Sequence, residues 1–459
     1  MSQSLAVDFR GQTASIAVAI GIAALLLAWP AFYNGYPLIP YDAAHPGMIG
    51  AHAVPWAQSG FYEPVVTSIR VRTGLWPIVF VQSAIAAHCL YLIGRVTCGT
   101  VHVGSYLTVM TALAFGSSLP WFTSLIAADF LLSIIVLGMF LLAFAGDRLA
   151  WIEKLYVFLL TTAAMAAHPS HLPVAAGVLI VVLILKFALG PSSRSRILAG
   201  VLIAGPLSLA VAAQLAANNH ARHGMALPTF SPIVLLGRMI EDGTAVSYLR
   251  DACPQRRYAL CDYLEELPQT SAALLWEDGA VIDKAGGLRL RDEASEIVAG
   301  TFAAYPLGQL GSGVINAAQQ FVTFEADDWL SSDNPGRRPT ARPVGQELSG
   351  DASANSTSRQ ATQTLPTAMI TIWHTFSALF GMTVSAFLFI EYCRRGDRDM
   401  IAFFLIILTA LVVNAFVIGS LSVVQGRFQS RLAWLAVLYA AMAAHHFYLC
   451  NPTETRREA

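Results

Sequence analysis

Long apolar stretches recur along the chain, separated by short polar turns and by one long polar interval. A helix needs about 20 apolar residues to cross the hydrocarbon core of a bilayer. Ten stretches reach or approach that length, and they predict transmembrane helices at residues 13–33, 74–95, 101–119, 122–145, 154–168, 171–189, 197–217, 367–391, 400–420 and 432–450. The pattern is that of an all-α polytopic membrane protein with about ten transmembrane helices.

The polar interval covers residues 218–366 and divides the chain into three regions. It holds 12 basic and 18 acidic residues, which are 30 of the 57 charged side chains. We therefore expect an N-terminal transmembrane region at 1–217 with about seven helices and a first outer loop at 34–73. A mainly helical insert at 218–366 and a C-terminal transmembrane region at 367–459, with about three helices, follow it.

Composition agrees with this division. Charged residues make up 12% of the chain and hydrophobic residues 55%, whereas a soluble protein carries about twice that charge fraction. A soluble globular protein is thereby excluded, and membrane lipid is the expected surrounding. The net charge of −1 gives no reason to expect a nucleic-acid partner.

Lysine and arginine predict the orientation, because they favour the cytoplasmic side of short loops. Twelve of them lie at one set of helix ends, and four lie at the other, namely Arg70, Arg72, Arg427 and Arg431. Both termini are therefore expected in the cytoplasm and the insert on the opposite side. The first stretch ends in Trp29-Pro30-Ala31-Phe32-Tyr33 without a small-x-small cleavage site, which favours a helix over a signal peptide.

The insert itself shows three patterns. Residues 292–304 predict a helix that stops near Tyr305-Pro306, and residues 331–365 are rich in Ser, Thr, Pro and Gly, which predicts disorder. Residues 306–324 predict an amphipathic helix lying on the membrane or on the transmembrane bundle, with a core helix of a small soluble domain as the alternative. Its apolar positions are Leu307, Leu310, Val314, Ala318 and Phe321, and its polar positions are Gln309, Asn316 and Gln320.

Six cysteines are too few for a disulfide scaffold. Cys253 and Cys261 lie close together inside the insert, and a bridge between them suits an oxidising compartment. The other four lie in or beside apolar stretches, where inert thiols are expected; these are Cys89, Cys98, Cys393 and Cys450.

Three carboxylates outside the insert fall within the membrane or on its outer side, namely Asp42, Glu63 and Asp129. Asp42 follows Pro37 and Pro40 in a loop, where it is either a general base towards an acceptor hydroxyl or a helix cap. Asp129 lies several residues inside the stretch 122–145. A carboxylate in a membrane is costly, so it faces a cavity or hydrogen-bonds to a neighbouring helix.

Basic residues on the same side complete the candidate site. Arg427 and Arg431 are four residues apart, so on a helix they share one face and suit a phosphate or pyrophosphate; interfacial anchoring is the alternative. His168 and His171 have the spacing of two metal ligands, but Pro169 between them favours a turn with hydrogen-bonded imidazoles. The sequence contains no cofactor motif, and it leaves open whether the protein uses a divalent metal, for which no ligands are assigned.

The chain resembles the GT-C superfamily of membrane glycosyltransferases and a set of uncharacterised bacterial multi-pass proteins. The resemblance is carried by Asn34-Gly35-Tyr36-Pro37-Leu38 through Asp42, Leu75-Trp76-Pro77 with Val81-Gln82, Leu119-Pro120-Trp121-Phe122 with Asp129, His168 with Ser170-His171-Leu172, and Arg427-x-x-x-Arg431-Leu432-x-Trp434. GT-C enzymes often have a second acidic residue beside the first, whereas Ala43 follows Asp42 here, so Glu63 or Asp129 shares the role in one interpretation.

The resemblance implies transfer of a sugar from a polyprenyl-phosphate donor to a lipid-linked or cell-envelope glycan or glycolipid acceptor. It also implies that the reaction occurs at the outer face of a bacterial inner membrane and that the insert lies in the periplasm. Asp42 would be the catalytic base, while Arg427 and Arg431, with Arg70 or Arg72, would hold the donor phosphate. A transporter or flippase of a lipid-linked glycan precursor is the alternative, and an envelope scaffold built on the insert is a third class.

Overall fold

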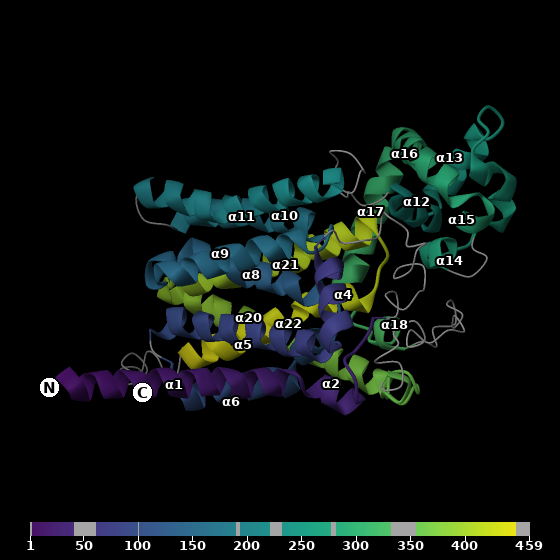
Figure 1. Ribbon diagram of the computed structural model, residues 1–459. Helices are drawn as coiled ribbons and strands as arrows, with labels where there is room; N and C mark the ends of the chain where they lie inside the picture. The colour runs from purple at the N-terminus through teal and green to yellow at the C-terminus, as the bar shows by residue number, and fades with distance from the viewer. Residues whose placement is uncertain are drawn as a thin grey trace.

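The computed structural model describes residues 2–40, 61–99, 101–189, 193–220, 232–276, 281–331 and 355–446. Within these ranges the protein is all-helical, with one isolated β-bridge between Leu38 and Leu125 and no strand. The fold is a bundle of long helices with a smaller group of helices at one end (Figure 1). The start of α1 and the end of α22 lie at the opposite end of the bundle.

The bundle is built from both transmembrane regions. Its N-terminal helices are α1 (Ser2–Leu27), α2 (Trp29–Asn34), α4 (Tyr62–Thr73), α5 (Trp76–Cys98), α6 (Val103–Gly116), α7 (Leu119–Ser124), α8 (Asp129–Phe144), the 3-10 turn η2 (Gly146–Arg148), α9 (Trp151–Ala166), α10 (His171–Leu189) and α11 (Ser193–His220). Its C-terminal helices are α20 (Thr367–Arg395), α21 (Arg398–Leu421) and α22 (Gly426–His445). Helix α8 lies at the centre of the bundle, and its residues from Phe130 to Ala143 are buried except Leu131.

Five helices are long and apolar enough to cross a membrane: Trp76–Cys98, His171–Ala188, Gly200–Ala217, Thr367–Arg395 and Arg398–Leu421. Shorter apolar helices cover Ala14–Leu27, Val103–Gly116 and Asp129–Phe144. The expectation of a helical membrane protein is therefore met. The number of ten spans remains a prediction.

The insert forms its own helical unit at one end of the bundle (Figure 1). It consists of α12 (Pro232–Glu241), α13 (Thr244–Ala252), η3 (Ala259–Glu266), α14 (Ser271–Trp276), α15 (Val281–Lys284) and α16 (Gly287–Ala304). A separate hydrophobic core holds these helices together, with Ile233, Leu249 and Ile297 fully buried in it. We refer to the end of the bundle that carries this unit as the insert end.

Helix α16 stops before Tyr305, as the Tyr305-Pro306 sequence predicts, and two further helices follow, α17 (Pro306–Val322) and α18 (Asp327–Leu330). Pro306 begins α17 because its fixed φ and missing N–H suit a first helical position. Helix α17 packs against α21 of the bundle and not within a separate soluble core. Of the two expectations for residues 306–324, the structure supports packing on the bundle.

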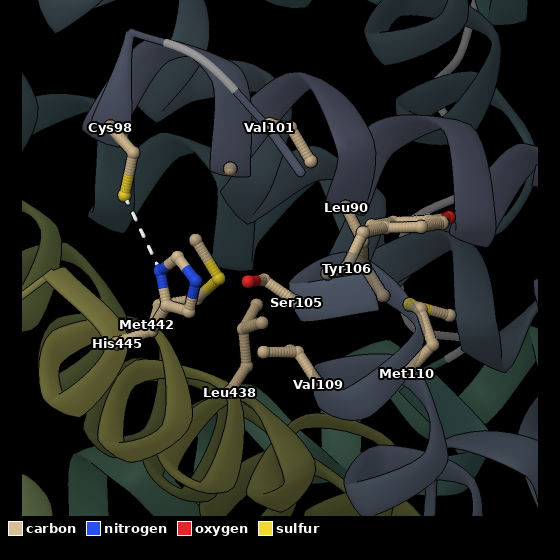
Figure 2. A pocket seen from close by; sticks show the side chains of 11 residues that line it. Leu90, Cys98, Val101, Ser105, Tyr106, Val109, Met110, Leu438, Met442 and His445 are labelled. Carbon is tan, nitrogen blue, oxygen red and sulfur yellow. Dashed lines mark hydrogen bonds between the residues drawn. The ribbon is translucent and has the colours of Figure 1, made fainter. Parts of the chain in front are cut away.

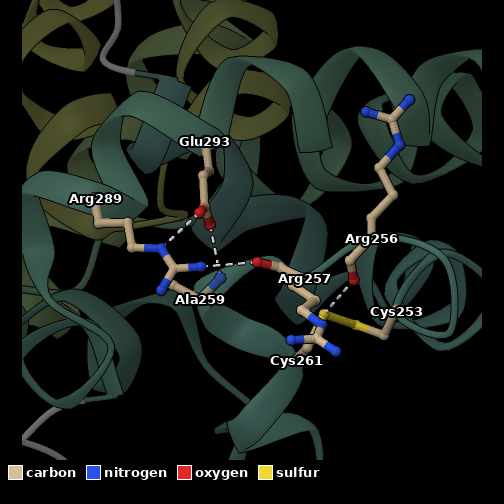
Figure 3. Close-up of a disulfide and its surroundings, with 7 residues drawn as sticks. All are labelled: Cys253, Arg256, Arg257, Ala259, Cys261, Arg289 and Glu293. Carbon is tan, nitrogen blue, oxygen red and sulfur yellow. Dashed lines mark hydrogen bonds and ion pairs between the residues drawn. A yellow bond between two sulfur atoms is a disulfide. The ribbon is translucent and has the colours of Figure 1, made fainter.

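Cys253 and Cys261 form a disulfide that closes the turn between α13 and η3, with their Cα atoms 5.6 Å apart. Figure 3 shows how α16 holds the same turn. The Glu293 carboxylate accepts hydrogen bonds from the Ala259 N–H at 2.7 Å and from Arg289 Nε at 2.8 Å. The covalent link and this charged pair together fix the loop against α16.

Cys98 departs from the expectation of an inert thiol, since it too is disulfide-bonded. Cys450 is the remaining cysteine and lies outside the described residues, whereas Cys89 and Cys393 are free. Cys98 ends α5, at the end of the bundle away from the insert. Disulfide-bonded cysteines therefore occur at both ends of the bundle, so they do not distinguish the two sides of the membrane. The predicted orientation depends on the distribution of lysine and arginine alone.

The stretch 122–145 was expected to be one helix, and this is wrong. Helix α7 ends at Ser124, Leu125 is extended, and α8 begins only at Asp129. The backbone groups freed by the break are used by the first outer loop, because Leu38 N–H donates to Ser124 O at 3.0 Å and Ile126 N–H donates to Leu38 O at 2.8 Å. Asp129 is consequently a first-turn residue and not a mid-helix one.

The expected disorder of 331–365 is also wrong for residues 355–365, while 332–354 lie outside the described residues. Gln360 holds the first outer loop through both amide atoms. Its Oε1 accepts from Ile39 N–H at 3.0 Å, and its Nε2 donates to Ile39 O at 2.7 Å. Arg359 Nε donates a further hydrogen bond to Tyr33 O at 3.0 Å. The polar composition of this segment predicts disorder, but it does not reveal that the Gln360 and Arg359 side chains hydrogen-bond to the backbone of Ile39 and Tyr33.

Candidate functional site

Asp129, Arg427 and Arg431 form a buried ionic cluster at the insert end of the bundle. Arg431 Nη1 lies 3.0 Å from Asp129 Oδ1, and Arg427 Nε lies 3.8 Å from Asp129 Oδ2. Arg431 Nη2 also donates to Asn414 Oδ1 of α21 at 2.8 Å. Both guanidinium groups lie near the Phe428 ring, at 4.8 and 5.1 Å from its centroid. The four-residue spacing does put the arginines on one face, and that face meets a carboxylate.

The two arginines lie within the first two turns of α22, whose start is held by residues of α17 and α18. Gln320 of α17 binds Gln425 twice, with Nε2 donating to Gln425 O at 2.8 Å and Oε1 accepting from Gln425 N–H at 2.9 Å. The Asp328 carboxylate accepts from Gly426 N–H at 2.5 Å. A methyl group at Gly426 would overlap the Glu325 backbone. The position of Arg427 is therefore set by backbone contacts that require glycine beside it.

A second layer of polar groups supports the broken helix before Asp129. Gln82 of α5 donates through Nε2 to Thr123 O and Leu125 O, both at 3.0 Å, which satisfies carbonyls freed where α7 ends. Gln82 Oε1 accepts from the Tyr62 hydroxyl at 2.9 Å. Burial raises the pKa of the Tyr62 phenol far above its usual value, and the charge of Asp129 raises it further. Tyr62 of α4 is thus a neutral hydrogen-bond donor close to Asp129.

His168 and His171 form the turn between α9 and α10, as the alternative to a metal pair predicted. His168 Nδ1 contacts Ser170 Oγ at 2.7 Å, and His171 Nδ1 lies 2.7 Å from Ala164 O, to which it donates. The ring centroids are 5.4 Å apart. No group of three or more His, Cys, Asp or Glu residues that could hold a metal occurs in the described parts of the chain. The turn lies close to the cluster, and an electrostatic interaction links His168 with Asp129.

Of the remaining predicted residues, the structure describes the side chains of Arg70 and Arg72, and these lie outside the ion pairs of the cluster. Arg70 and Arg72 are at the end of α4, and among the described residues neither makes an ion pair with Asp129. Glu63 is in the first turn of α4, and its side chain lies outside the described parts. Asp42 also lies outside the described residues; the chain is described up to Pro40, two residues after the Leu38 bridge.

An apolar pocket between α5, α6 and α22 lies towards the opposite end (Figure 2). Leu90, Val109 and Met442 contribute to its lining, and Cys98 Sγ contacts His445 Nδ1 there at 3.5 Å. His445 is about 21 Å along α22 from Arg431 at 1.5 Å per residue. Its described lining residues include no arginine or lysine to bind a phosphate, and the pocket is separate from the ionic cluster.

Sequence reasoning did not assign three residues that shape the site to it, namely Asn414, Gln82 and Gln320; Gln82 was quoted only as part of the resemblance. The first two carry a detectable signal, because an amide inside an apolar stretch needs a partner in the membrane. Gln320 was recognised only as part of the polar face of its helix. Its partner Gln425 is 105 residues away in the chain, and no local pattern connects the two.

No protein-family model, curated protein or solved structure matches the chain.

Proposed function

We propose that the chain is a GT-C-type glycosyltransferase that takes a sugar from a polyprenyl-phosphate donor and passes it to a lipid-linked or cell-envelope glycan. The proposal includes ten transmembrane helices in a bacterial inner membrane, cytoplasmic termini and a periplasmic insert at 218–366. The twelve-to-four distribution of lysine and arginine supports this orientation. The reaction would then occur at the periplasmic, insert end of the bundle.

One observation carries the proposal: the buried ionic cluster lies at the insert end of the bundle, beside the outer loop that leads to Asp42. Aromatic side chains fill the bundle on the other side of the cluster, where the Phe403 ring lies 4.4 Å from Phe140 and 5.8 Å from Tyr439. A transporter or flippase needs polar groups along a path near the membrane midplane. A cluster at one end of the bundle fits a reaction at the membrane surface better than it fits a transport path.

The chemistry assigns different roles to the two aspartates. Asp42 would take the proton of the acceptor hydroxyl, whose oxygen attacks the anomeric carbon of the donor sugar. The bond between that carbon and the phosphate oxygen breaks, and the phosphate leaves with the electron pair. Asp129 is already engaged by two arginines. We therefore assign it as their counter-ion and positioning residue, in place of the catalytic role expected from the sequence.

Arginine suits the leaving phosphate because guanidinium donates in a fixed, planar geometry to two oxygens. Arg431 is committed to Asp129 and Asn414. Arg427 has the longer separation from Asp129, 3.8 Å, and it is the arginine nearer to the start of α22, at the insert end. Arg427 is thus the residue we assign to the donor phosphate.

The experiment compares polyprenyl phosphate with polyprenol, which has the same chain without the phosphate, as ligands for the purified protein. A rise in melting temperature with the phosphate alone, and polyprenyl phosphate among co-purified lipids by mass spectrometry, would support the proposal. Transfer from a labelled polyprenyl-phosphate sugar is then measured for the parent and for Asp42→Asn. Wild-type transfer by a folded Asp42→Asn protein would contradict the assignment of the base. Transbilayer movement of a lipid-linked precursor without transfer would favour a flippase.

A further inference from the structure

Helix α17 turns three of its four amide side chains towards the protein, and the fourth, Gln319, is exposed. Gln309, Asn316 and Gln320 are buried. Asn316 Nδ2 donates to both carboxylate oxygens of Asp242 in the insert, at 3.0 and 3.2 Å, and Gln309 bonds to Thr244. With Gln320 bound to Gln425, the polar face of α17 links the insert to the start of α22. These contacts satisfy side chains that would otherwise be costly to bury.

The backbone of α17 lies directly on α21. Gly313 O accepts from Ser420 Oγ at 2.9 Å. A Cβ atom at Gly419 would be 2.5 Å from Asn316 O, so glycine is required for this approach. The close contact fixes the rotation of α17 about its own axis, and with it the direction of the opposite face.

That opposite face is apolar and exposed. Leu307 is 82% exposed, Leu310 and Val314 are each 62%, Ile315 is 67% and Val322 is 60%. No Asp, Glu, Lys or Arg occurs between Pro306 and Val322. A soluble domain would have put these side chains inside and the glutamines outside. The amphipathic pattern is thus inverted relative to a helix that faces water.

Helix α17 packs on α21, one of the helices able to cross a membrane, and α21 also exposes apolar side chains. On α21, Leu408, Val412 and Phe416 are 38, 50 and 49% exposed, and Phe416 is one turn before the contact at Ser420. An apolar surface shared with a membrane helix indicates the same surroundings for both. Helices that contact lipid bury their polar groups and expose their apolar ones.

We propose that α17 lies in the hydrocarbon of the bilayer at the insert end, with lipid acyl chains against Leu307, Leu310, Val314, Ile315 and Val322. The last long helix of the insert is then a membrane-embedded element, and 17 residues give it a length of about 25 Å. It joins Asp242 of the insert to Gln425 beside the arginines. This placement is independent of the proposed chemistry.

The test uses single cysteines that carry a small thiol-reactive fluorophore, in protein reconstituted into bilayer nanodiscs. Leu310→Cys and Val314→Cys probe α17, and Ser295→Cys on an exposed position of α16 is the control. The background carries Cys393→Ser, because Cys393 is exposed. Spin-labelled (doxyl) lipids quench fluorophores in hydrocarbon, and iodide quenches those in water.

We expect doxyl lipid to quench the label at 310 and 314 several-fold more than iodide does, and the reverse at 295. Ile315→Cys replaces either α17 variant if it does not elute as a folded protein. Iodide quenching at 310 and 314 would overturn the proposal, since the face would be in water. Protection from both quenchers would overturn it as well, because a second copy or another protein would then cover the face.

Discussion

Asp129 and Arg431 are 302 residues apart in the chain, and their side chains meet at 3.0 Å inside the bundle. Asp129 begins α8, and Arg431 is in the second turn of α22. An ion pair at this depth is costly to desolvate, and removing one partner leaves the other charge uncompensated. The pair therefore ties the first transmembrane region to the last.

We expect Asp129→Asn to lower the free energy of unfolding by about 3–5 kcal/mol, because two buried guanidinium groups lose their counter-ion. Denaturant unfolding in detergent micelles measures this. Asp399→Asn is the control, since it breaks the exposed pair with Arg148 and is expected to cost about 1 kcal/mol or less. Equal effects of the two substitutions would contradict a structural role for the buried pair.

Arg427→Gln should weaken binding of polyprenyl phosphate about 10- to 100-fold, because one charge-assisted hydrogen bond contributes about 1.5–3 kcal/mol. Isothermal titration in detergent with the phosphate, and with polyprenol as the reference ligand, measures the change. Arg394→Gln replaces an arginine at the other end of the bundle with a side chain 75% exposed, and its affinity should equal that of the parent. Unchanged affinity in Arg427→Gln would remove Arg427 from the proposed phosphate site.

Gln320→Ala should lower stability by about 1–3 kcal/mol, because the N–H of Gln425 loses its partner. It should also lower phosphate affinity, since the start of α22 is held by this bond. Gln319→Ala changes the exposed neighbouring residue on the same helix and should change neither quantity. If the two variants behave alike, the contact between α17 and α22 does not position Arg427.

Gly419→Ala should destabilise the protein by about 1–3 kcal/mol, because the added methyl meets the Asn316 carbonyl and α17 must move away from α21. Gly21→Ala is the matched helical substitution, with no atom within 4 Å of the added Cβ, and should stabilise α1 by about 0.5–1 kcal/mol. Melting temperatures of both variants in the same micelles give the comparison. A neutral Gly419→Ala would show that the two helices separate without cost.

The amino-acid sequence determined the apolar helices, because a membrane-spanning helix needs a run of apolar residues and little else. It also determined the turn at His168 and His171, the helix boundary at Tyr305-Pro306 and the shared face of Arg427 and Arg431, since proline chemistry and helical spacing are local. The Cys253–Cys261 disulfide was expected from eight residues of separation. Each of these features depends on neighbours in the chain.

Only the tertiary structure decided what the buried charges contact. Asp129 was expected in the middle of a helix, but the helix breaks before it because the Leu38 backbone pairs with residues 124 and 126. Gln360 and Gln320 form backbone contacts across 321 and 105 residues. The outward direction of the apolar face of α17 is set by its contact with Gly419. Amphipathic spacing identifies two faces of a helix, whereas the surroundings of each face depend on elements that are distant in the chain.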